Sequence, residues 1–392
     1  METLKNLLKN NLRQYTMLIA LVLVLIIFQI ATGGVLLLPM NVTNVIIQNA
    51  YVFILAIGMM ILLINGGNID LSVGSVVAFV GAILGVMLIT YHMPLWLAIV
   101  VALIIGVLIG VWQGFWIAYV HIPGFIVTLA GMLIFRGWTN AILHGLTLAP
   151  FSDTFANISA GFLPDFIPFM GTQFNVTAML VGILAAAIYI AFAMRGRANK
   201  QRFSADLAPF PFFLAQVFLV TAVLLVSFYW LAAYRGLPTI FIIIAVLVIV
   251  YQFFTSKTVP GRYIYAMGGN EKAAKLSGIN TNKVLFLCYV NMAVLAAVAA
   301  IDTTARLNAA SPLAGQNYEM DAISSCFIGG ASMYGGAGTI TGAIIGALFM
   351  AALNNGMSIL GTGTDMQLIV KGLVLLFAVA FDIFSKSRAK AS

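Results

Sequence analysis

The sequence predicts an all-α protein, a polytopic bundle of transmembrane helices. Of its 392 residues, 62% are hydrophobic and only 8% are charged, and the mean hydropathy is +1.08. A soluble core cannot absorb that much apolar surface. The apolar runs are about 20 residues long, whereas a membrane β-barrel needs alternating strands of about 10 residues. We therefore expect one transmembrane domain over residues 1–392.

Ten apolar segments are candidate spans. The first follows Lys5, Lys9 and Arg13 and resembles a signal peptide, but it is long and has no convincing small-residue cleavage site, so an uncleaved span is expected. A Gly-rich region, Ile323–Leu353, lies between the last two spans. The ten segments are Tyr15–Leu38, Val45–Ile64, Val73–Thr90, Leu95–Val120, Phe125–Leu143, Phe174–Met194, Phe212–Ala233, Thr239–Phe254, Lys283–Thr304 and Met366–Phe384.

The distribution of Lys and Arg predicts the topology, because these residues mark cytoplasmic loops. Starting from an inside N-terminus, 15 of the 19 Lys and Arg residues fall on one side, in both termini, the loop after the sixth span and the loop 255–283. Two inside termini require an even number of crossings. The region Ile323–Leu353 must then cross twice, or form half-helices around Gly335 and Gly336 with an adjustment elsewhere. We expect about 12 spans, with 10 or 11 as alternatives.

A weak internal repeat is visible in the polar residues that follow two spans. Asp70 and Ser72 with Ser75 follow the second span, and Asp321 with Ser325 follows the ninth, on the opposite face. An inverted repeat of a transporter has this arrangement, although chance similarity explains it equally well. Small residues four apart predict close helix packing; they are Gly106, Gly110 and Gly114, Gly81 and Gly85, and Gly342 and Gly346.

The sequence carries no recognisable chemistry of its own. It has no phosphate-binding G-x-x-x-x-G-K-[ST] loop and no metal-ligand spacing of His, Cys, Asp and Glu, so we expect no catalytic residue, metal or cofactor in this chain. The net charge of +8 lies in short loops and does not indicate nucleic acid. Cys288 and Cys326 fall in apolar segments, where we expect free, buried thiols.

Charged and aromatic residues near the spans have structural explanations. Ionisable side chains in a membrane are costly, and snorkelling or a structural ion pair accounts for them better than ion coupling does. Two aromatic stripes could stack on a sugar, but an interfacial aromatic belt explains them better, because it needs no ligand. The charged residues are Asp70, Arg136, Asp302, Arg306, Lys371 and Asp382; the stripes are Trp112 with Trp116 and Phe115 with Tyr119.

A polar stretch at residues 260–280 predicts a short helix. Asn270 can be its N-cap, Glu271 favours the positive helix end, and Gly278 is a natural stop. Two turns are unstable alone in water. The helix therefore needs a surface, either its own bundle or a soluble partner.

Several motifs resemble the permease subunits of bacterial monosaccharide ABC importers, the ribose, galactose, arabinose and xylose type, which are related to branched-chain amino acid permeases. The resemblance covers nearly the whole chain in order. Its motifs are Asp70-Leu71-Ser72-Val73-Gly74-Ser75, residues 123–132 with Phe135-Arg136-Gly137, residues 261–270 with Ala273-Ala274 and 276–279, Ile328-Gly329-Gly330, Gly335-Gly336, and Asn354-Asn355-Gly356-Met357.

The resemblance implies a type II importer permease in the bacterial inner membrane, with both termini cytoplasmic. Its partners would be a second copy of the chain, a double-cassette ATPase that holds ATP and Mg²⁺, a periplasmic sugar-binding protein and membrane lipid. The loop 255–283 would carry the coupling helix. The coupling residues would be Gly268, Gly269, Asn270, Glu271, Ala273, Ala274, Leu276 and Gly278.

Two departures from the family pattern stand out. Short ribose-type members have one span where residues 174–235 and their surroundings suggest three in this chain. The additional spans resemble the xylose and multiple-monosaccharide subgroup of the family. Within it, the multiple-monosaccharide permease is the nearest likeness. Asn65-Gly66-Gly67-Asn68 stands where many relatives carry an acid before the Ile69-Asp70 pair. Any role that this acidic residue has in those relatives cannot be assigned to this chain.

The expected function is that of a non-enzymatic channel subunit for pentose or hexose uptake, driven by the ATPase. The alternative is a secondary sugar transporter coupled to H⁺ or Na⁺, which requires an ionisable pair near the midplane and leaves the short helix without a role. Polarity and position suggest five residues along the pathway: Asp70, Ser72, Ser75, Thr128 and Asp321.

Overall fold

The structure is a computed structural model that describes residues 12–167, 174–202 and 209–391. In these ranges the regular structure is helical, with two isolated β-bridges between loops. The all-α prediction is therefore confirmed. The helices of the first half are α2 (Leu12–Ala31), α3 (Pro39–Gln48), α4 (Ala50–Ile64), α5 (Val73–Gly85), extended by a π-helical turn (Val86–Thr90), α6 (Leu95–Ala118), α7 (Gly124–Leu143) and α8 (Asp153–Ala160).

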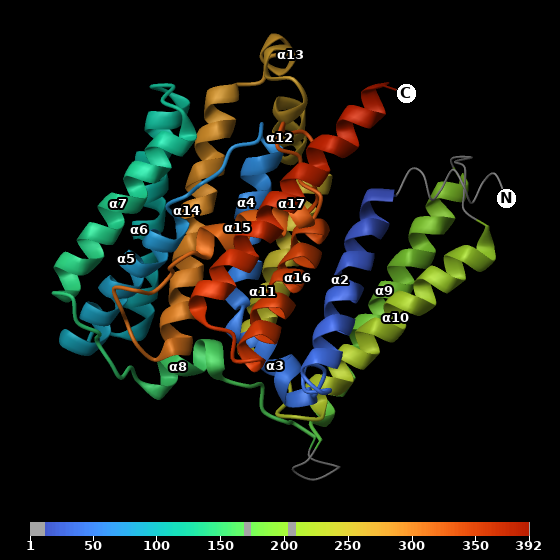
Figure 1. The fold of residues 1–392 in the computed structure, drawn as a ribbon, viewed down its shortest axis with the longest axis horizontal. Helices are drawn as coiled ribbons and strands as arrows, with labels where there is room; N and C mark the ends of the chain where they lie inside the picture. Colours follow the sequence, from blue (N-terminus) through green and yellow to red (C-terminus); the bar gives the residue numbers. More distant parts are fainter. Residues whose placement is uncertain (1–11, 168–173, 203–208, 392) are drawn as a thin grey trace.

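The second half of the chain returns through the same bundle (Figure 1). Within the described residues, eight helices are long and apolar enough to cross a membrane, or nine if the bent pair of α3 and α4 counts as one span. The helices of this half are α9 (Val176–Arg202), α10 (Phe210–Ala232), α11 (Thr239–Lys257), α12 (Val259–Gly269), α13 (Glu271–Leu276), α14 (Thr281–Leu307), α15 (Tyr318–Ile328), α16 (Ile340–Ile359) and α17 (Thr364–Ala391).

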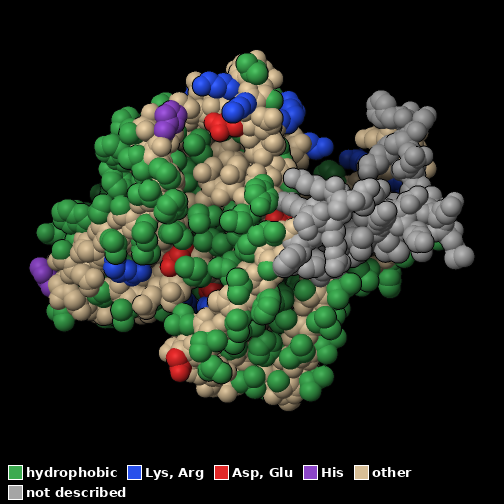
Figure 2. Space-filling view, turned by 45° about the horizontal axis from the view of Figure 1, so that its top comes forward, with side chains coloured by type: hydrophobic (Ala, Val, Ile, Leu, Met, Phe, Trp, Pro, Cys, Tyr) green, Lys and Arg blue, Asp and Glu red, His purple; other side chains and the backbone are tan. Residues whose placement is uncertain are grey.

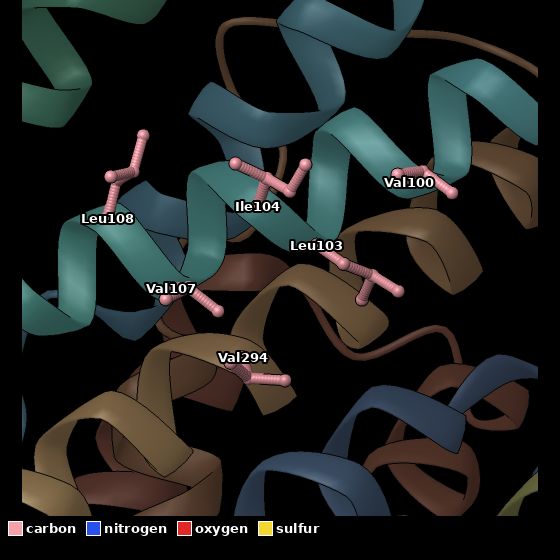
Figure 3. Close-up of a pocket in the computed structure, with 6 residues that line it drawn as sticks. All are labelled: Val100, Leu103, Ile104, Val107, Leu108 and Val294. Carbon is pink, nitrogen blue, oxygen red and sulfur yellow. The ribbon is translucent and has the colours of Figure 1, made fainter.

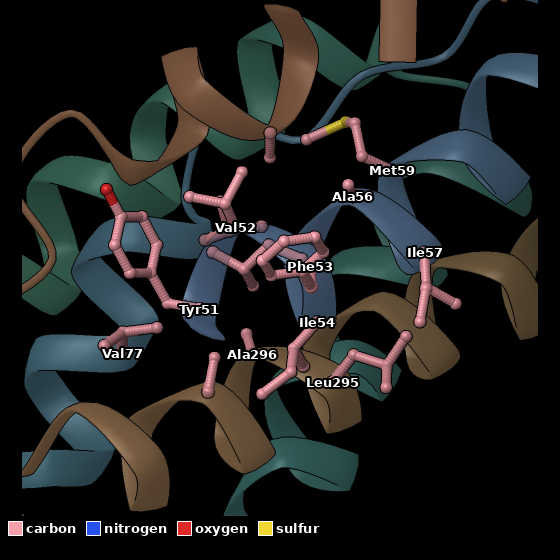
Figure 4. Packing of buried hydrophobic residues seen from close by; sticks show 14 of the residues in the cluster. Tyr51, Val52, Phe53, Ile54, Ala56, Ile57, Met59, Val77, Leu295 and Ala296 are labelled. Carbon is pink, nitrogen blue, oxygen red and sulfur yellow. The ribbon is translucent and has the colours of Figure 1, made fainter. Parts of the chain in front are cut away.

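Helix α4 lies at the centre of the bundle. All 15 of its residues are buried, because its sequence is apolar on every face. It packs against α14, α15 and α16, and Figure 4 shows Ile54 and Ile57 of α4 close to Leu295 of α14. A Cβ at Gly58 would collide with the sulfur of Met292. This glycine lets α4 and α14 approach closely, as small residues do in membrane bundles.

The Gly-rich region Ile323–Leu353 contains one short and one long helix. Helix α15 has 11 residues, too few to cross about 30 Å of hydrocarbon at 1.5 Å per residue, whereas α16 has 20. Two full crossings within this region are therefore wrong, and the half-helix alternative holds for α15. Gly335 and Gly336 lie in the connection with φ of +81° and +71°, which only glycine adopts without strain.

Two further boundaries differ from the sequence prediction. The first span was expected to reach Leu38, but α2 ends at Ala31, because Gly33 and Gly34 take positive φ values there. Asn49 interrupts the second span, so that α3 and α4 meet at 48°. This break is the second irregular crossing in the described bundle.

Helices α9 and α10 form a peripheral hairpin at residues 174–235 (Figure 1). They share a hydrophobic cluster that is separate from the main core and includes Phe228 and Leu231. Near the end of α9, the guanidinium of Arg197 lies over the ring of Phe213, 4.8 Å from its centroid. The region predicted to hold additional spans therefore forms a hairpin at the edge of the bundle, where its cluster also packs against Ile46 of α3 and Phe241 of α11.

Many of the basic side chains lie at one end of the bundle (Figure 2). The start of α2, helix α13 and the end of α17 lie at this end (Figure 1). Figure 2 shows a group of Lys and Arg side chains there, around one acidic patch. The start of α2, helix α13 and the end of α17, which the sequence assigned to one side of the membrane, thus share one end of the described fold (Figure 1).

Candidate coupling surface and buried polar networks

Helix α13 is the capped short helix that the sequence predicts. The Asn270 side chain accepts a hydrogen bond from the backbone N–H of Ala273 at 3.0 Å. The helix ends at Leu276, and Gly278 follows with φ of +84°. A second Asn cap, Asn280, accepts from Lys283 N and begins α14. The Asn270 cap and the Gly278 turn therefore define the two ends of α13 from local sequence.

Helix α13 contacts its own chain along one edge and leaves the rest free. Ala274 is 5% exposed and faces the packing with α12 and α14, whereas Leu276 is 90% exposed. Gly268 at the end of α12 is also buried. Gly268 and Ala274 are therefore the expected coupling residues that pack against the chain itself. The other expected coupling residues are on the exposed side: Gly269, Asn270, Glu271, Ala273, Leu276 and Gly278.

A backbone joint connects the end of α12 to the bundle. Gly336 N donates to the carbonyl oxygen of Ile64 at 2.8 Å, and a Cβ at Gly268 would overlap both of those atoms. The hydroxyl of Tyr265 donates to Gly338 O at 2.9 Å. The joint therefore ties α12, the end of α4 and the α15–α16 connection together at the root of α13.

An ion pair lies inside the bundle at the start of α15. Lys371 of α17 approaches both carboxylate oxygens of Asp321 at 3.0 Å. The same carboxylate accepts from the Tyr51 hydroxyl at 2.6 Å and from the Asn354 amide at 3.2 Å. Asp321 is 1% exposed and Lys371 is 16% exposed. The sequence singled out both charges, but not their pairing or Tyr51.

Aromatic stacking extends this cluster. The rings of Tyr51 and Tyr318 are parallel, with centroids 3.5 Å apart. Asn354 also donates to the Asn49 side chain at 3.3 Å. Four helices, α4, α15, α16 and α17, therefore meet at Asp321. The pair Asn354-Asn355, two polar residues inside an apolar run, was the sequence feature that could have indicated a buried polar contact here.

A second polar network surrounds Asp70, between α4 and α5. Its carboxylate accepts from the backbone N–H of Ser72 at 2.8 Å and from the Ser72 hydroxyl at 2.6 Å. Gln113 of α6 donates to that hydroxyl at 2.6 Å. The Ser75 hydroxyl donates to Ser72 O, and Thr128 donates to Gly124 O of its own helix. All five suggested pathway residues are thus buried: Asp70, Ser72 and Ser75 share this network, Asp321 lies in the other, and Thr128 bonds within α7.

Other charges near the spans also have internal partners. Arg136 donates to Pro312 O at 2.8 Å and Ala314 O at 2.7 Å, which fixes the segment before α15. Asp302 accepts from Ser159 of α8 at 2.6 Å. Arg136, Asp302 and Lys371 therefore each have a partner within the bundle, as a structural role requires. Cys288 and Cys326 are free and buried, as predicted. In the described part of the chain, no cluster of acidic, His or Cys side chains could hold a metal.

Comparison with known proteins supports one family over most of the chain. The sequence model described as "Branched-chain amino acid transport system / permease component" matches residues 41–379. A xylose transport system permease protein of Haemophilus influenzae is 39% identical over 96% of this chain and 98% of its own length. The corresponding Escherichia coli protein is 37% identical over 97% of this chain and 94% of its length.

More distant relatives match less of the chain. A ribose import permease protein of Escherichia coli is 31% identical over 87% of this chain and 85% of its own length. No solved structure matches.

Proposed function

This chain belongs to the family of branched-chain amino acid transport system permease components, and from that premise we propose that it is the membrane-spanning subunit of an ATP-driven monosaccharide importer. The observation that carries the proposal is the xylose permease relative, which is similar over 96% of the chain. A pentose such as xylose is the first substrate to test. The ribose relative, at 31% identity, supports the same class of cargo.

Helix α13 is the proposed contact with a separate ATPase. It is capped at both ends, yet most of its surface, including the Leu276 side chain, has no covering element in the described structure. An exposed leucine with Ala273 and Gly278 beside it suits a shallow groove on another protein, because such interfaces centre on apolar anchors. ATP and Mg²⁺ belong to that partner in this proposal.

The joint at Gly268 supports a route for coupling. Movement of α13 moves α12, and α12 contacts the end of α4 and the α15–α16 connection through backbone atoms. Helix α4 lies at the centre of the bundle. Closure of the ATPase would therefore be transmitted to the core rather than to a peripheral helix.

The remaining partners follow from the same assignment. The protein would act as a homodimer in the bacterial inner membrane, with the α13 end and both termini in the cytoplasm. A periplasmic sugar-binding protein would deliver substrate to the opposite end. The basic residues grouped around α13 support this orientation by the positive-inside rule.

The pathway assignment of Asp70, Ser72, Ser75, Thr128 and Asp321 stays a prediction. Each side chain is buried within one chain, so a pathway along them requires the two polar networks to open. The Lys371–Asp321 pair is the candidate for the ionisable pair that an ion-coupled secondary transporter needs near the midplane. The exposed, capped α13 favours the ATPase-driven alternative.

Uptake of labelled xylose into proteoliposomes tests the proposal. We expect uptake only when the permease is reconstituted with its ATPase, its binding protein and ATP. Xylose uptake by the permease alone, abolished by a protonophore, would instead establish the secondary transporter. Leu276→Glu is the matched variant, because it changes the exposed face of α13 without disturbing the packing at Ala274.

A further inference from the structure

A cavity opens beside α12 on the outer surface of the bundle. It has a volume of about 270 Å³ and lies between α4, α11, α12 and α14. Ile61, Ile264 and Cys288 form its buried floor, and Val250 and Leu287 stand half-exposed at its mouth. In a transmembrane bundle, a mouth rimmed by exposed apolar side chains on long spans opens toward lipid.

Two lysines continue the walls of this cavity toward the end where α13 lies. Lys257 is three residues after the wall residue Phe254 in α11, and Lys283 is four residues before Leu287 in α14. Residues three or four apart share one face of a helix, and four residues span about 6 Å along its axis. Both lysines are exposed, and neither has an ion-pair partner among the described residues.

A second groove, between α6 and α14, differs from this cavity in its lining. It has a similar volume, about 280 Å³, but only aliphatic side chains of α6 and α14 line it. Figure 3 shows Val100, Leu103 and Val107 of α6 there, with Val294 of α14. It resembles ordinary lipid-facing surface. The cavity beside α12 differs because it combines apolar depth with cationic side chains one helical turn away.

We propose that the cavity beside α12 binds one acyl chain of an anionic phospholipid whose phosphate contacts Lys257 and Lys283. The apolar walls take the chain, and the two ammonium groups lie at the bundle end where headgroups would be. Basic residues at this level attract anionic lipids. Because Ile264 belongs to α12, the bound chain also braces the segment that carries α13.

Native mass spectrometry of the purified chain with equimolar dioleoyl phosphatidylglycerol and dioleoyl phosphatidylcholine tests the proposal. Wild type should retain phosphatidylglycerol preferentially. Lys257→Gln with Lys283→Gln should lower that preference roughly 25-fold, because each lysine near an anionic headgroup contributes roughly fivefold. The matched control is Lys272→Gln with Lys275→Gln, which removes two charges from α13 away from the cavity and should leave the preference unchanged.

A second variant separates the acyl chain from the headgroup. Leu287→Trp fills the mouth of the cavity and should reduce retention of both lipids while both lysines remain. Equal retention of the two lipids by wild type would overturn the proposal, and so would equal losses in the two lysine pairs. Loss of oligomers from Leu287→Trp with unchanged lipid would show that the cavity is a protein interface instead.

Discussion

Removing the ammonium group of Lys371 should destabilise the bundle strongly. Lys371→Met keeps the apolar stem but leaves the Asp321 carboxylate, 1% exposed, without its cation. Breaking a buried ion pair from one side costs about 3–5 kcal/mol. Asp321 retains its hydrogen bonds from Tyr51 and Asn354, and Lys371 is partly exposed. We therefore expect the low end, a loss of about 3 kcal/mol in the free energy of unfolding.

The reverse change should be milder. Asp321→Asn leaves the 16% exposed Lys371, which can extend its flexible stem toward water or headgroups. We expect a cost of about 1.5 kcal/mol, the low end of the range for hydrogen bonds to charged groups. The double variant carries no unpaired buried charge, so it should be more stable than Lys371→Met alone.

Reversible unfolding in mixed detergent micelles measures these differences, and the free energy of unfolding of each variant is compared with that of the folded wild type. Lys275→Met is the control, because it removes an exposed cation from α13 and should change stability by less than about 0.5 kcal/mol. A cost below about 1 kcal/mol for Lys371→Met would refute the reasoning. A double variant as unstable as the sum of the two single changes would do so as well.

Three further predictions concern the coupling end and the opposite end of the bundle. Leu276→Glu should abolish co-purification with the ATPase without changing thermal stability. Ala274→Glu should lower the melting temperature, because the Ala274 side chain is buried. The opposite pattern would show that the exposed and buried faces of α13 are assigned the wrong way round. Gly268→Val should reduce ATP-dependent uptake more than tenfold while membrane insertion persists, since its side chain collides with backbone; normal uptake would contradict a rigid joint. The Thr177 hydroxyl, with backbone N–H groups, lowers the pKa of Asp165. This stabilisation is present above the ordinary carboxyl pKa of about 3.9 and is lost as the pH falls through the lower folded value. The protection of amides at the start of α9, measured against the exchange rate of an unstructured peptide at the same pH, should therefore fall below about pH 4 in wild type and show no such step in Asp165→Asn.

Local signals in the sequence were sufficient for many elements. The Asn270 cap and the Gly278 stop predicted α13 because they satisfy helix ends within a few residues of chain. Long apolar runs predicted α6, α7 and α14 because the bilayer fixes their length. The positions of Lys and Arg predicted which segments share an end of the bundle.

Features that depend on distant partners could not be read in the same way. The pairing of Lys371 with Asp321 joins residues 50 positions apart, and Tyr51 reaches the same carboxylate across 270 positions. The buried edge of α13 depends on α12 and α14, so the sequence could not distinguish Ala274 from Leu276. The short α15 reflects backbone packing around Gly329 and Gly342, which an apolar composition does not reveal.

The joint at Gly268 has a consequence for how precisely motion is passed through the protein. Its contacts join main-chain atoms of α12, α4 and the α15–α16 connection, and main-chain atoms have no rotamers in which to absorb a displacement. Side chains can yield by rotating about χ angles at a cost of about 1 kcal/mol; the Tyr265 contact of this joint can do so, whereas the contacts among Gly268, Ile64 and Gly336 cannot. We therefore expect a displacement of α12 to move the end of α4 with it, and a single methyl group added at Gly268 to hold these segments apart.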